Sequence, residues 1–309
     1  MDKRLKLMSY SSNLTLHECP RKLQLYKLRA SSAGNSDSDN LTFAYGHAVG
    51  TGIQHVFEGR AETEIIWHMF CNWDVELFAS NTKQVKSFWH AVLAVQKFIS
   101  LRTNGFLKDY ELISYNGVPA AELSFKIVLP NDFIYRGHVD AVLRNTKTGA
   151  ITVLEVKTSS SDTINPASYK NSAQAIGYSV VLDVIVPETS AYEVLYLVYK
   201  TKSMEYEILK FPKSYLQRAQ WIQELLLDAD TIQMYESTGV YPMHGESCAG
   251  KYYRDCEYLQ VCTLSTAYLA TPEPEIADIN RETGEEQQYQ IVLSISDLIA
   301  AQLAKEVVT

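Results

Sequence analysis

The sequence predicts an α/β protein with a mixed central β-sheet flanked by helices. Strand-like and helix-like segments alternate along the middle of the chain, as in layered α/β folds. The strand patterns, rich in β-branched and aromatic residues, lie at residues 120–129, 133–144, 150–158, 193–200 and 203–211. Helical apolar spacing occurs before, between and after these strands, at residues 41–100, 166–185 and 213–237. We therefore expect helices to cover a sheet built from all five strands.

The composition is that of an ordinary globular protein. The chain has 309 residues, of which 46% are hydrophobic and 21% are charged, so it can bury a full core in one or two domains. No apolar stretch follows the basic N-terminus, and none approaches the roughly 20 residues that a membrane span needs. These features predict a cytoplasmic protein without a membrane anchor.

Charge is distributed unevenly along the chain. The net charge is −8, yet residues 1–30 hold seven basic and two acidic residues, whereas residues 271–309 hold two basic and eight acidic residues. A local basic surface for nucleic-acid phosphates is therefore compatible with the overall negative charge.

A predicted hairpin carries the main chemical signal. The turn "NTKTG" at residues 145–149 separates Asp140 from Glu155 and Lys157, and such a turn folds one strand back beside the other. Side chains alternate across a strand, so Glu155 and Lys157 share one face while Val156 points into the core. The sequence thus predicts two carboxylates and an amine on one surface.

This arrangement fits a metal site. Asp140, Glu155 and the backbone carbonyl of Val156 offer hard oxygen ligands for Mg²⁺ or Mn²⁺. A metal held there would lower the pKa of a bound water and neutralise charge on a phosphodiester, and Lys157 would orient that water or stabilise developing charge. The alternative is a solvated strand face with a surface ion pair, which is common for an isolated Glu-x-Lys.

The order of three short motifs resembles the PD-(D/E)XK nuclease superfamily, specifically its RecB-like branch. A Gly-x-x-Asp pattern spans residues 137–140, Glu-x-Lys spans residues 155–157, and Gln-x-x-x-Tyr spans residues 174–178 on the following helix. The resemblance covers about residues 9–262. It implies a restriction-endonuclease-like nuclease core in which Asp140, Glu155 and Lys157 are catalytic.

The same resemblance assigns further roles. It implies that Gln174 and Tyr178, which share one helix face, contact DNA near the metal. Glu122 matches an acidic residue on the strand before the aspartate and is expected to support the metal or the structure. Relatives also carry a Gly-x-x-x-His pattern on an early helix, but here residues 46–50 begin and end in glycine. His55, five residues on, is the candidate replacement, and His138 on the Asp140 strand is a second one.

Three of the five cysteines are clustered near the end of the chain, at Cys248, Cys256 and Cys262. Their spacing is wider than the paired spacing of zinc sites, and an iron–sulfur cluster needs four thiolates. Together with Cys19 they resemble the RecB-like exonucleases whose four-cysteine cluster joins the N- and C-terminal segments, and this resemblance implies a cluster of the 4Fe-4S type. Zinc at the same thiolates is the alternative. Cys71 has no partner pattern and is predicted to be a buried thiol.

The terminal regions give weaker signals. Residues 8–30 are interpreted as a loop, a turn at Cys19 and Pro20, and a short helix. Residues 270–288 are acidic and rich in turn formers, which indicates a linker or a disordered tail. Ser296 is a candidate N-cap for a final helix. That segment could dock on the body of the protein or on a partner such as a recombination or replication protein.

These observations predict a metal-dependent DNA exonuclease of recombination, repair or phage DNA processing. The alternative is a DNA-binding or scaffold subunit that keeps the nuclease fold without cleaving. The predicted division is an N-terminal segment with the first cysteine, a helical region, a nuclease core, a cysteine-rich segment and an acidic tail. The respective residues are 1–40, 41–110, 111–240, 241–268 and 269–309.

Overall fold

The computed structural model describes residues 1–29, 37–74, 77, 86–188, 191–250, 254–280 and 285–306. The chain folds into two compact units, each built from separate stretches of sequence. Unit 1 contains Met1–Asn35, Ser124–Gly137 and Ala219–Thr309. Unit 2 contains Ser36–Leu123 and His138–Arg218. The predicted metal-site residues all lie in unit 2, and the four cysteines predicted to act together lie in unit 1.

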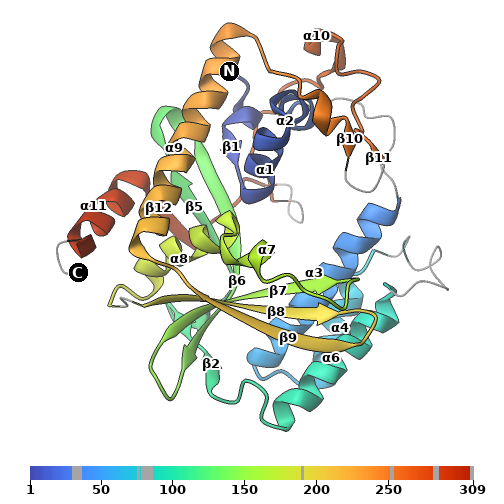
Figure 1. The fold of residues 1–309 in the computed structure, drawn as a ribbon, viewed down its shortest axis with the longest axis vertical. Coiled ribbons are helices and arrows are strands. Elements are labelled where there is room, and N and C mark those ends of the chain that lie inside the picture. The colour runs from blue at the N-terminus through green and yellow to red at the C-terminus, as the bar shows by residue number, and fades with distance from the viewer. Residues whose placement is uncertain are drawn as a thin grey trace. The chain divides into compact units, whose positions relative to one another are not determined.

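A mixed sheet forms the centre of unit 2 (Figure 1). Strand β7 (Ile151–Ser159) is antiparallel to β6 (Ile134–Asn145) and parallel to β8 (Tyr192–Lys200). Strand β9 (Glu205–Pro212) is antiparallel to β8, and the short β2 (Tyr110–Leu112) is antiparallel to β6. This pairing confirms the predicted mixed sheet. The strand predicted at residues 120–129 is β5 (Ala121–Val128).

The turn between β6 and β7 sets the register of the hairpin. The side chain of Asn145 accepts hydrogen bonds from the amides of Lys147 and Thr148, at 3.0 and 3.1 Å, which is the local bonding that favours Asn in turns. Gly149 adopts a φ of +74°, a conformation that glycine reaches without steric cost. The hairpin predicted from "NTKTG" is therefore confirmed.

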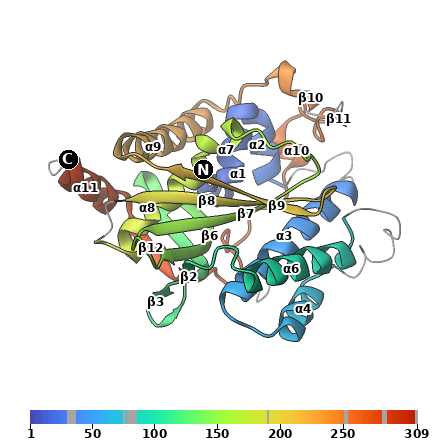
Figure 2. The same ribbon diagram turned by 60° about the horizontal axis from the view of Figure 1, so that its bottom comes forward.

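Helices lie on both faces of this sheet, as Figure 2 shows. On one face are α3 (Asp37–Phe57), α4 (Glu62–Cys71) and α6 (Phe88–Thr103), which bury a common apolar core. Gly52 permits their close approach, because a Cβ at this position would overlap the Val95 side chain. The opposite face carries α7 (Ala167–Lys170) and α8 (Ala173–Ile185).

The single helix predicted at residues 166–185 is wrong, because the chain breaks between α7 and α8. Asn171 is the C-cap of α7 and Ser172 is the N-cap of α8, with ψ of 25° and 122° respectively. Asn and Ser compete with the helical backbone through their own hydrogen bonds and so favour such positions. The apolar periodicity of the segment is continuous and does not reveal the break.

A buried ion pair connects α8 to the start of α9 (Tyr215–Thr238). Arg218 is fully buried and pairs with Asp183, which also accepts a hydrogen bond from the Tyr192 hydroxyl. The guanidinium carbon of Arg218 lies 3.5 Å from the centroid of the Tyr192 ring. Each charge is thus compensated by the other inside unit 2.

Unit 1 brings together the two ends of the chain. Its helices near the N-terminus are η1 (Lys3–Lys6), α1 (Tyr10–Glu18) and α2 (Pro20–Lys27). The amide of Arg21 donates to the carbonyl of Pro242 at 3.1 Å, and its Nε donates to the carbonyl of Cys262 at 2.9 Å. Backbone acceptors near the C-terminus therefore hold the N-terminal segment.

The loop predicted before Cys19 is instead helix α1. Ser9 and Ser12 form a capping box, in which each side chain bonds the backbone of the other residue. The helix is polar on most sides, so it lacks the apolar periodicity on which the interpretation depended. Ser9, a residue type favoured at the N-cap, was the local signal that could have found it.

The C-terminal segment is also more ordered than predicted. Strand β12 (Ile291–Ser294) pairs in parallel with β5, from Ile291 opposite Phe125 to Ser294 opposite Val128. The Ser294 hydroxyl accepts from the amide of Ser296 at 3.2 Å, so helix α11 (Ile295–Glu306) begins before the predicted cap. Of the two alternatives for this segment, the structure shows docking on the chain itself.

The remaining elements are short. They are β1 (Leu7–Met8), which pairs in parallel with the start of β6, β3 (Ser114–Tyr115), β4 (Val118–Pro119), η2 (Pro130–Asp132), η3 (Gly245–Ser247), β10 (Ala249–Gly250), β11 (Arg254–Asp255) and α10 (Thr266–Leu269). Every helix in the described ranges is too short or too polar to span a bilayer.

The ion pair of Asp183 and Arg218 gives a stability prediction. Asp183→Ala leaves a buried guanidinium without its carboxylate, and we expect it to lower the free energy of unfolding by roughly 3–5 kcal/mol. Tyr192→Phe removes one hydrogen bond and should cost about 1 kcal/mol. Urea denaturation of both variants measures the two losses, and equal small losses would contradict the buried pair.

Candidate active site

Strand alternation places the predicted catalytic side chains on one face of the sheet. Val156 packs against the core beneath α3, α4 and α6, together with Leu154 and Ala141. Asp140, which precedes Ala141, and Glu155, which lies between Leu154 and Val156, therefore face the opposite side, where α7 and α8 lie. The expected orientation of Val156 into the core is found.

Asp140 is held by the backbone of the neighbouring strand. The β6–β7 ladder runs from Arg144 opposite Ile151 to Ala141 opposite Leu154. One step beyond it, the amide of Val156 donates to Oδ2 of Asp140 at 3.0 Å. The carboxylate is thus fixed between the two strands by a hydrogen bond that favours its charged form.

Glu155 lies beside Asp140 and is almost completely buried, with 1% of its surface exposed. Its Oε1 is 2.5 Å from Nζ of Lys157. Its Oε2 is buried and has no hydrogen-bond partner among the described residues. The solvated strand face considered as the alternative is therefore wrong for Glu155, since a buried carboxylate oxygen without a partner is costly.

Lys157 is oriented by the helix that follows. Its Nζ donates to Oε1 of Gln174 at 3.1 Å, and Nε2 of Gln174 donates to the hydroxyl of Tyr178 at 2.8 Å. Gln174 and Tyr178 thus form one hydrogen-bonded chain with Lys157. The structure brings both residues to Lys157, which lies beside Glu155, and their predicted contact with DNA stays a prediction.

Burial raises the pKa of both carboxyl groups. The pKa of Asp140 lies well above its usual value, first because of burial and second because of the Glu155 charge. The Val156 amide and Lys157 oppose this shift. Burial likewise raises the pKa of Glu155, against the opposing charge of Lys157. The site therefore lacks the positive charge needed to hold two ionised carboxylates.

Glu122 contributes a third negative charge near this pair. Its charge adds to the rise in the pKa of both Asp140 and Glu155, although its own side chain is exposed. Its φ of +50° lies in the left-handed region, which is uncommon for a residue other than glycine. Such strain concentrates at functional sites, and no sequence pattern predicts it here.

Tyr169 is a neighbour that sequence reasoning missed. Burial raises the pKa of its phenol, and the positive charge of Lys157 opposes that rise. The residue lies on α7, whose separation from α8 was not predicted, so its approach to Lys157 could not be read from spacing.

The acidic pair fits a hard divalent cation. Mg²⁺ is typically bound by one or two carboxylates, with water and substrate phosphate completing its shell. The unpartnered Oε2 of Glu155 and the raised pKa of Asp140 and Glu155 both indicate a missing positive charge. No group of three or more His, Cys, Asp or Glu side chains that could hold a metal occurs within the described residues.

The two histidine candidates for metal binding, His55 and His138, lie in different surroundings. Nδ1 of His55 bonds Oε2 of Glu58 at 3.0 Å, and its ring lies 5.0 Å from that of His68. His55 lies on α3, which packs on the face of the sheet to which Val156 points. The structure therefore does not bring His55 to the acidic pair, which lies on the other face. His138 is exposed on β6. At Gly50, where the resemblance led us to expect histidine, a Cβ would meet nothing within 4 Å.

The four cysteines lie in unit 1 in a looser arrangement than predicted. The amide of Cys256 donates to the carbonyl of Cys248 at 2.8 Å, and Cys256 and Cys262 pack against Leu25 and Tyr258. In the described part of the chain they do not assemble into a group of three metal ligands. The predicted burial of Cys71 is wrong, because this thiol is exposed on the last turn of α4.

Comparison with known families identifies the core. Residues 7–263 match the model of the PD-(D/E)XK nuclease superfamily. The chain belongs to this superfamily. The match spans the strands that carry Asp140, Glu155 and Lys157, and it makes these residues the candidate nuclease site. Curated proteins gave no match.

One solved structure is similar to this chain at low identity. It is the crystal structure of a protein described as a "putative exonuclease" from Eubacterium rectale. It is 13% identical with a TM-score of 0.48, and the alignment covers 80% of this chain and 87% of that chain.

The raised pKa of Asp140 predicts how stability depends on pH. A carboxyl with a higher pKa in the folded state binds more protons when folded, so stability falls as pH rises from the unfolded value near 4 through the folded value. In EDTA, we expect the free energy of unfolding to fall less over this pH range in Asp140→Asn than in the wild type, by at least about 1 kcal/mol. Urea denaturation from pH 4.5 to pH 8 measures it.

The exposed Asp132, whose side chain is 93% accessible, provides the matched control. Asp132→Asn makes the same chemical change and should leave the pH profile of stability unaltered. A wild-type protein whose stability rises with pH over this range would contradict the assignment.

Proposed function

We propose that this member of the PD-(D/E)XK superfamily is a metal-dependent DNA exonuclease that acts in recombination, repair or phage DNA processing. The observation that carries the proposal is the pair of a half-buried Asp140 and a buried Glu155, with Lys157 beside it. The uncompensated negative charge of this pair supports the need for a divalent cation. The exonuclease class follows from the sequence resemblance to RecB-like enzymes.

The residues have distinct tasks in this proposal. Asp140 and Glu155 would hold Mg²⁺ or Mn²⁺, with the Val156 carbonyl as a further ligand and Glu122 in support. The ion would neutralise charge on the phosphodiester and lower the pKa of its bound water. Lys157 would direct its Nζ at the attacking water or at the charge that develops on the phosphate.

The Gln174 amide has a positioning task. Its Oε1 accepts a hydrogen bond from the Lys157 ammonium, and its Nε2 donates one to the Tyr178 hydroxyl. A lysine has four flexible carbons, so an amide 3.1 Å from its Nζ limits the directions in which it can point. We propose that Tyr178 and Gln174 also contact the DNA strand.

Cleavage assays test the proposal. End-labelled linear DNA and circular DNA are incubated with Mg²⁺, Mn²⁺ or EDTA, and we expect metal-dependent loss of the linear substrate alone. Glu155→Gln and Lys157→Ala should each lower the rate by at least about 100-fold, because each removes charge at the reacting phosphate.

Lys147→Ala is the matched control, because Lys147 is exposed at the far end of the same hairpin and pairs with Asp109. It should cleave like the wild type. Cleavage of circular DNA would indicate an endonuclease. DNA binding without cleavage under every metal condition would favour the alternative, a binding or scaffold subunit.

We further propose that Cys19, Cys248, Cys256 and Cys262 hold an iron–sulfur cluster of the 4Fe-4S type. Burial lowers the pKa of Arg21, whereas the charges of Cys262 and Cys19 raise it. Both sulfurs therefore lie near the Arg21 guanidinium. Cys248 and Cys256 are neighbours across the β10–β11 hairpin. Zinc at the same thiolates is the alternative, and the expected role is to stabilise unit 1.

Metal analysis of protein purified without oxygen tests this second proposal. We expect about four iron atoms per chain, and Cys256→Ser should lower both the iron content and the melting temperature. Cys71→Ser, which alters an exposed thiol on α4, should change neither. Stoichiometric zinc, or full stability with all thiols titratable, would overturn the cluster.

A further inference from the structure

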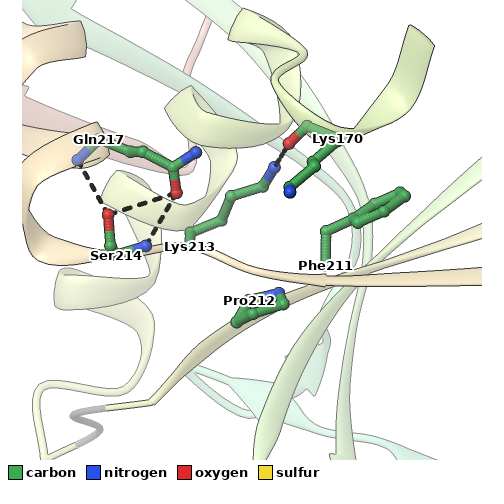
Figure 3. Close-up of a pocket in the computed structure, with 6 residues that line it drawn as sticks. All are labelled: Lys170, Phe211, Pro212, Lys213, Ser214 and Gln217. Atoms are coloured by element: carbon green, nitrogen blue, oxygen red, sulfur yellow. Dashed lines mark hydrogen bonds between the residues drawn. The ribbon is translucent and has the colours of Figure 1, made fainter. Parts of the chain in front are cut away.

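A pocket of about 310 Å³ lies in unit 2 (Figure 3). It is formed where β9 leaves the sheet and α9 begins, with α7 on the other side. Figure 3 shows the Lys170 and Lys213 side chains and the Phe211 ring around it. The lining residues are Lys170, Phe211, Pro212, Lys213, Ser214 and Gln217.

Lys213 is a buried cation at this pocket. The residue is only 3% exposed, and its Nζ donates to the carbonyl of Lys170 at 2.6 Å. Within the described residues its ammonium makes no ion pair with a carboxylate. Burial lowers the pKa of Lys213 to about 8, so the side chain is still mostly protonated at neutral pH. A buried ammonium without a counter-ion is costly unless an anion compensates it.

The other lining groups also favour an anion. Lys170 brings a second ammonium that is exposed, and none of the six lining residues is acidic. Ser214 and Gln217 cap the first turn of α9, with the Ser214 hydroxyl accepting from the Gln217 amide at 3.2 Å. The 24-residue helix α9 thus directs its positive end toward the pocket.

Aromatic rings connect this pocket to the acidic pair. Tyr169, whose pKa is raised by burial and lowered in part by the charge of Lys157, immediately precedes Lys170. Its ring lies 4.9 Å from that of Tyr196, which lies 6.2 Å from that of Phe211. Both sites are on the same side of the sheet as α7. Tyr196 is itself buried, so its ring packs between Tyr169 and Phe211 and supports both sites from beneath.

We propose that this pocket binds one phosphate of the DNA strand that is cleaved at the acidic pair, with the adjoining base against the Phe211 ring. Lys170 and Lys213 would neutralise the phosphate, and the ring would accept a base of any sequence by stacking. The inference rests on the proposed nuclease function and adds a second contact that fixes the strand. A free mononucleotide offers the same chemistry, so the test separates the two.

Binding of a fluorescent oligonucleotide in EDTA tests the strand contact without cleavage. Anisotropy is measured at several salt concentrations for the wild type, Lys170→Ala and Lys213→Gln. Each variant should bind about 5- to 10-fold more weakly at low salt. The slope of log Kd against log salt should fall by about 0.7 for single-stranded DNA or about 0.9 for duplex.

Two controls keep the result decisive. Lys147→Ala removes an exposed lysine of the same charge and should alter neither the affinity nor the slope. Lys170 is exposed, so its variant should melt like the wild type even if the buried Lys213→Gln variant does not. Wild-type affinity and slope in folded Lys170→Ala would overturn the proposal.

The remaining outcomes assign each failure to its cause. If the wild type cleaves DNA but Lys170→Ala cleaves and binds equally well, the pocket proposal fails and the nuclease function stands. If the wild type neither binds nor cleaves DNA, the proposed function fails with it. If the variants lose affinity for dAMP while retaining that for DNA, the pocket serves a free nucleotide, which also overturns the strand contact.

Discussion

The ion pair between the buried Glu155 carboxylate and the Lys157 ammonium, 2.5 Å apart, is the interaction on which the rest of the site depends. The half-buried Asp140 and the buried Glu155 lie together on β6 and β7, and within the described residues one ammonium and one backbone amide offset their charge. Burying charge without full compensation is unfavourable. The protein therefore keeps an electrostatic deficit at the point where a cation would bind.

The central position of β7 explains why this deficit can be maintained. The strand pairs with β6 on one side and with β8 on the other, so its backbone is fixed along its whole length. Alternation then directs Leu154 and Val156 into the core beneath α3, and Glu155 and Lys157 toward α7 and α8. Core packing on one face thus supports a strained polar arrangement on the other.

The break between α7 and α8 serves both the acidic pair and the proposed phosphate pocket. Because the chain interrupts the helix at Asn171 and Ser172, α8 directs Gln174 at Lys157 while α7 places Tyr169 and Lys170 beside the sheet. In a continuous helix, Lys170 and Gln174 would lie about one turn apart with a fixed relative orientation. The interruption allows each to be positioned separately.

Much of the site could be predicted from the sequence, because its parts lie on elements with strong local signals. The turn at residues 145–149 and the alternation of β7 determine that Asp140, Glu155 and Lys157 share one face, and the helical spacing of Gln174 and Tyr178 brings both to it. The order of these motifs was also enough to predict the superfamily.

Tertiary structure alone decided the features that depend on packing between distant segments. The burial of Glu155, the left-handed backbone of Glu122 and the contact of the His55 ring with that of His68 have no local signature. The docking of β12 on β5 likewise joins residues more than 160 positions apart. Local propensity sets which elements form and which side chains share a face, whereas desolvation, and with it the pKa of Asp140 and Glu155, arises only when the folded chain excludes water.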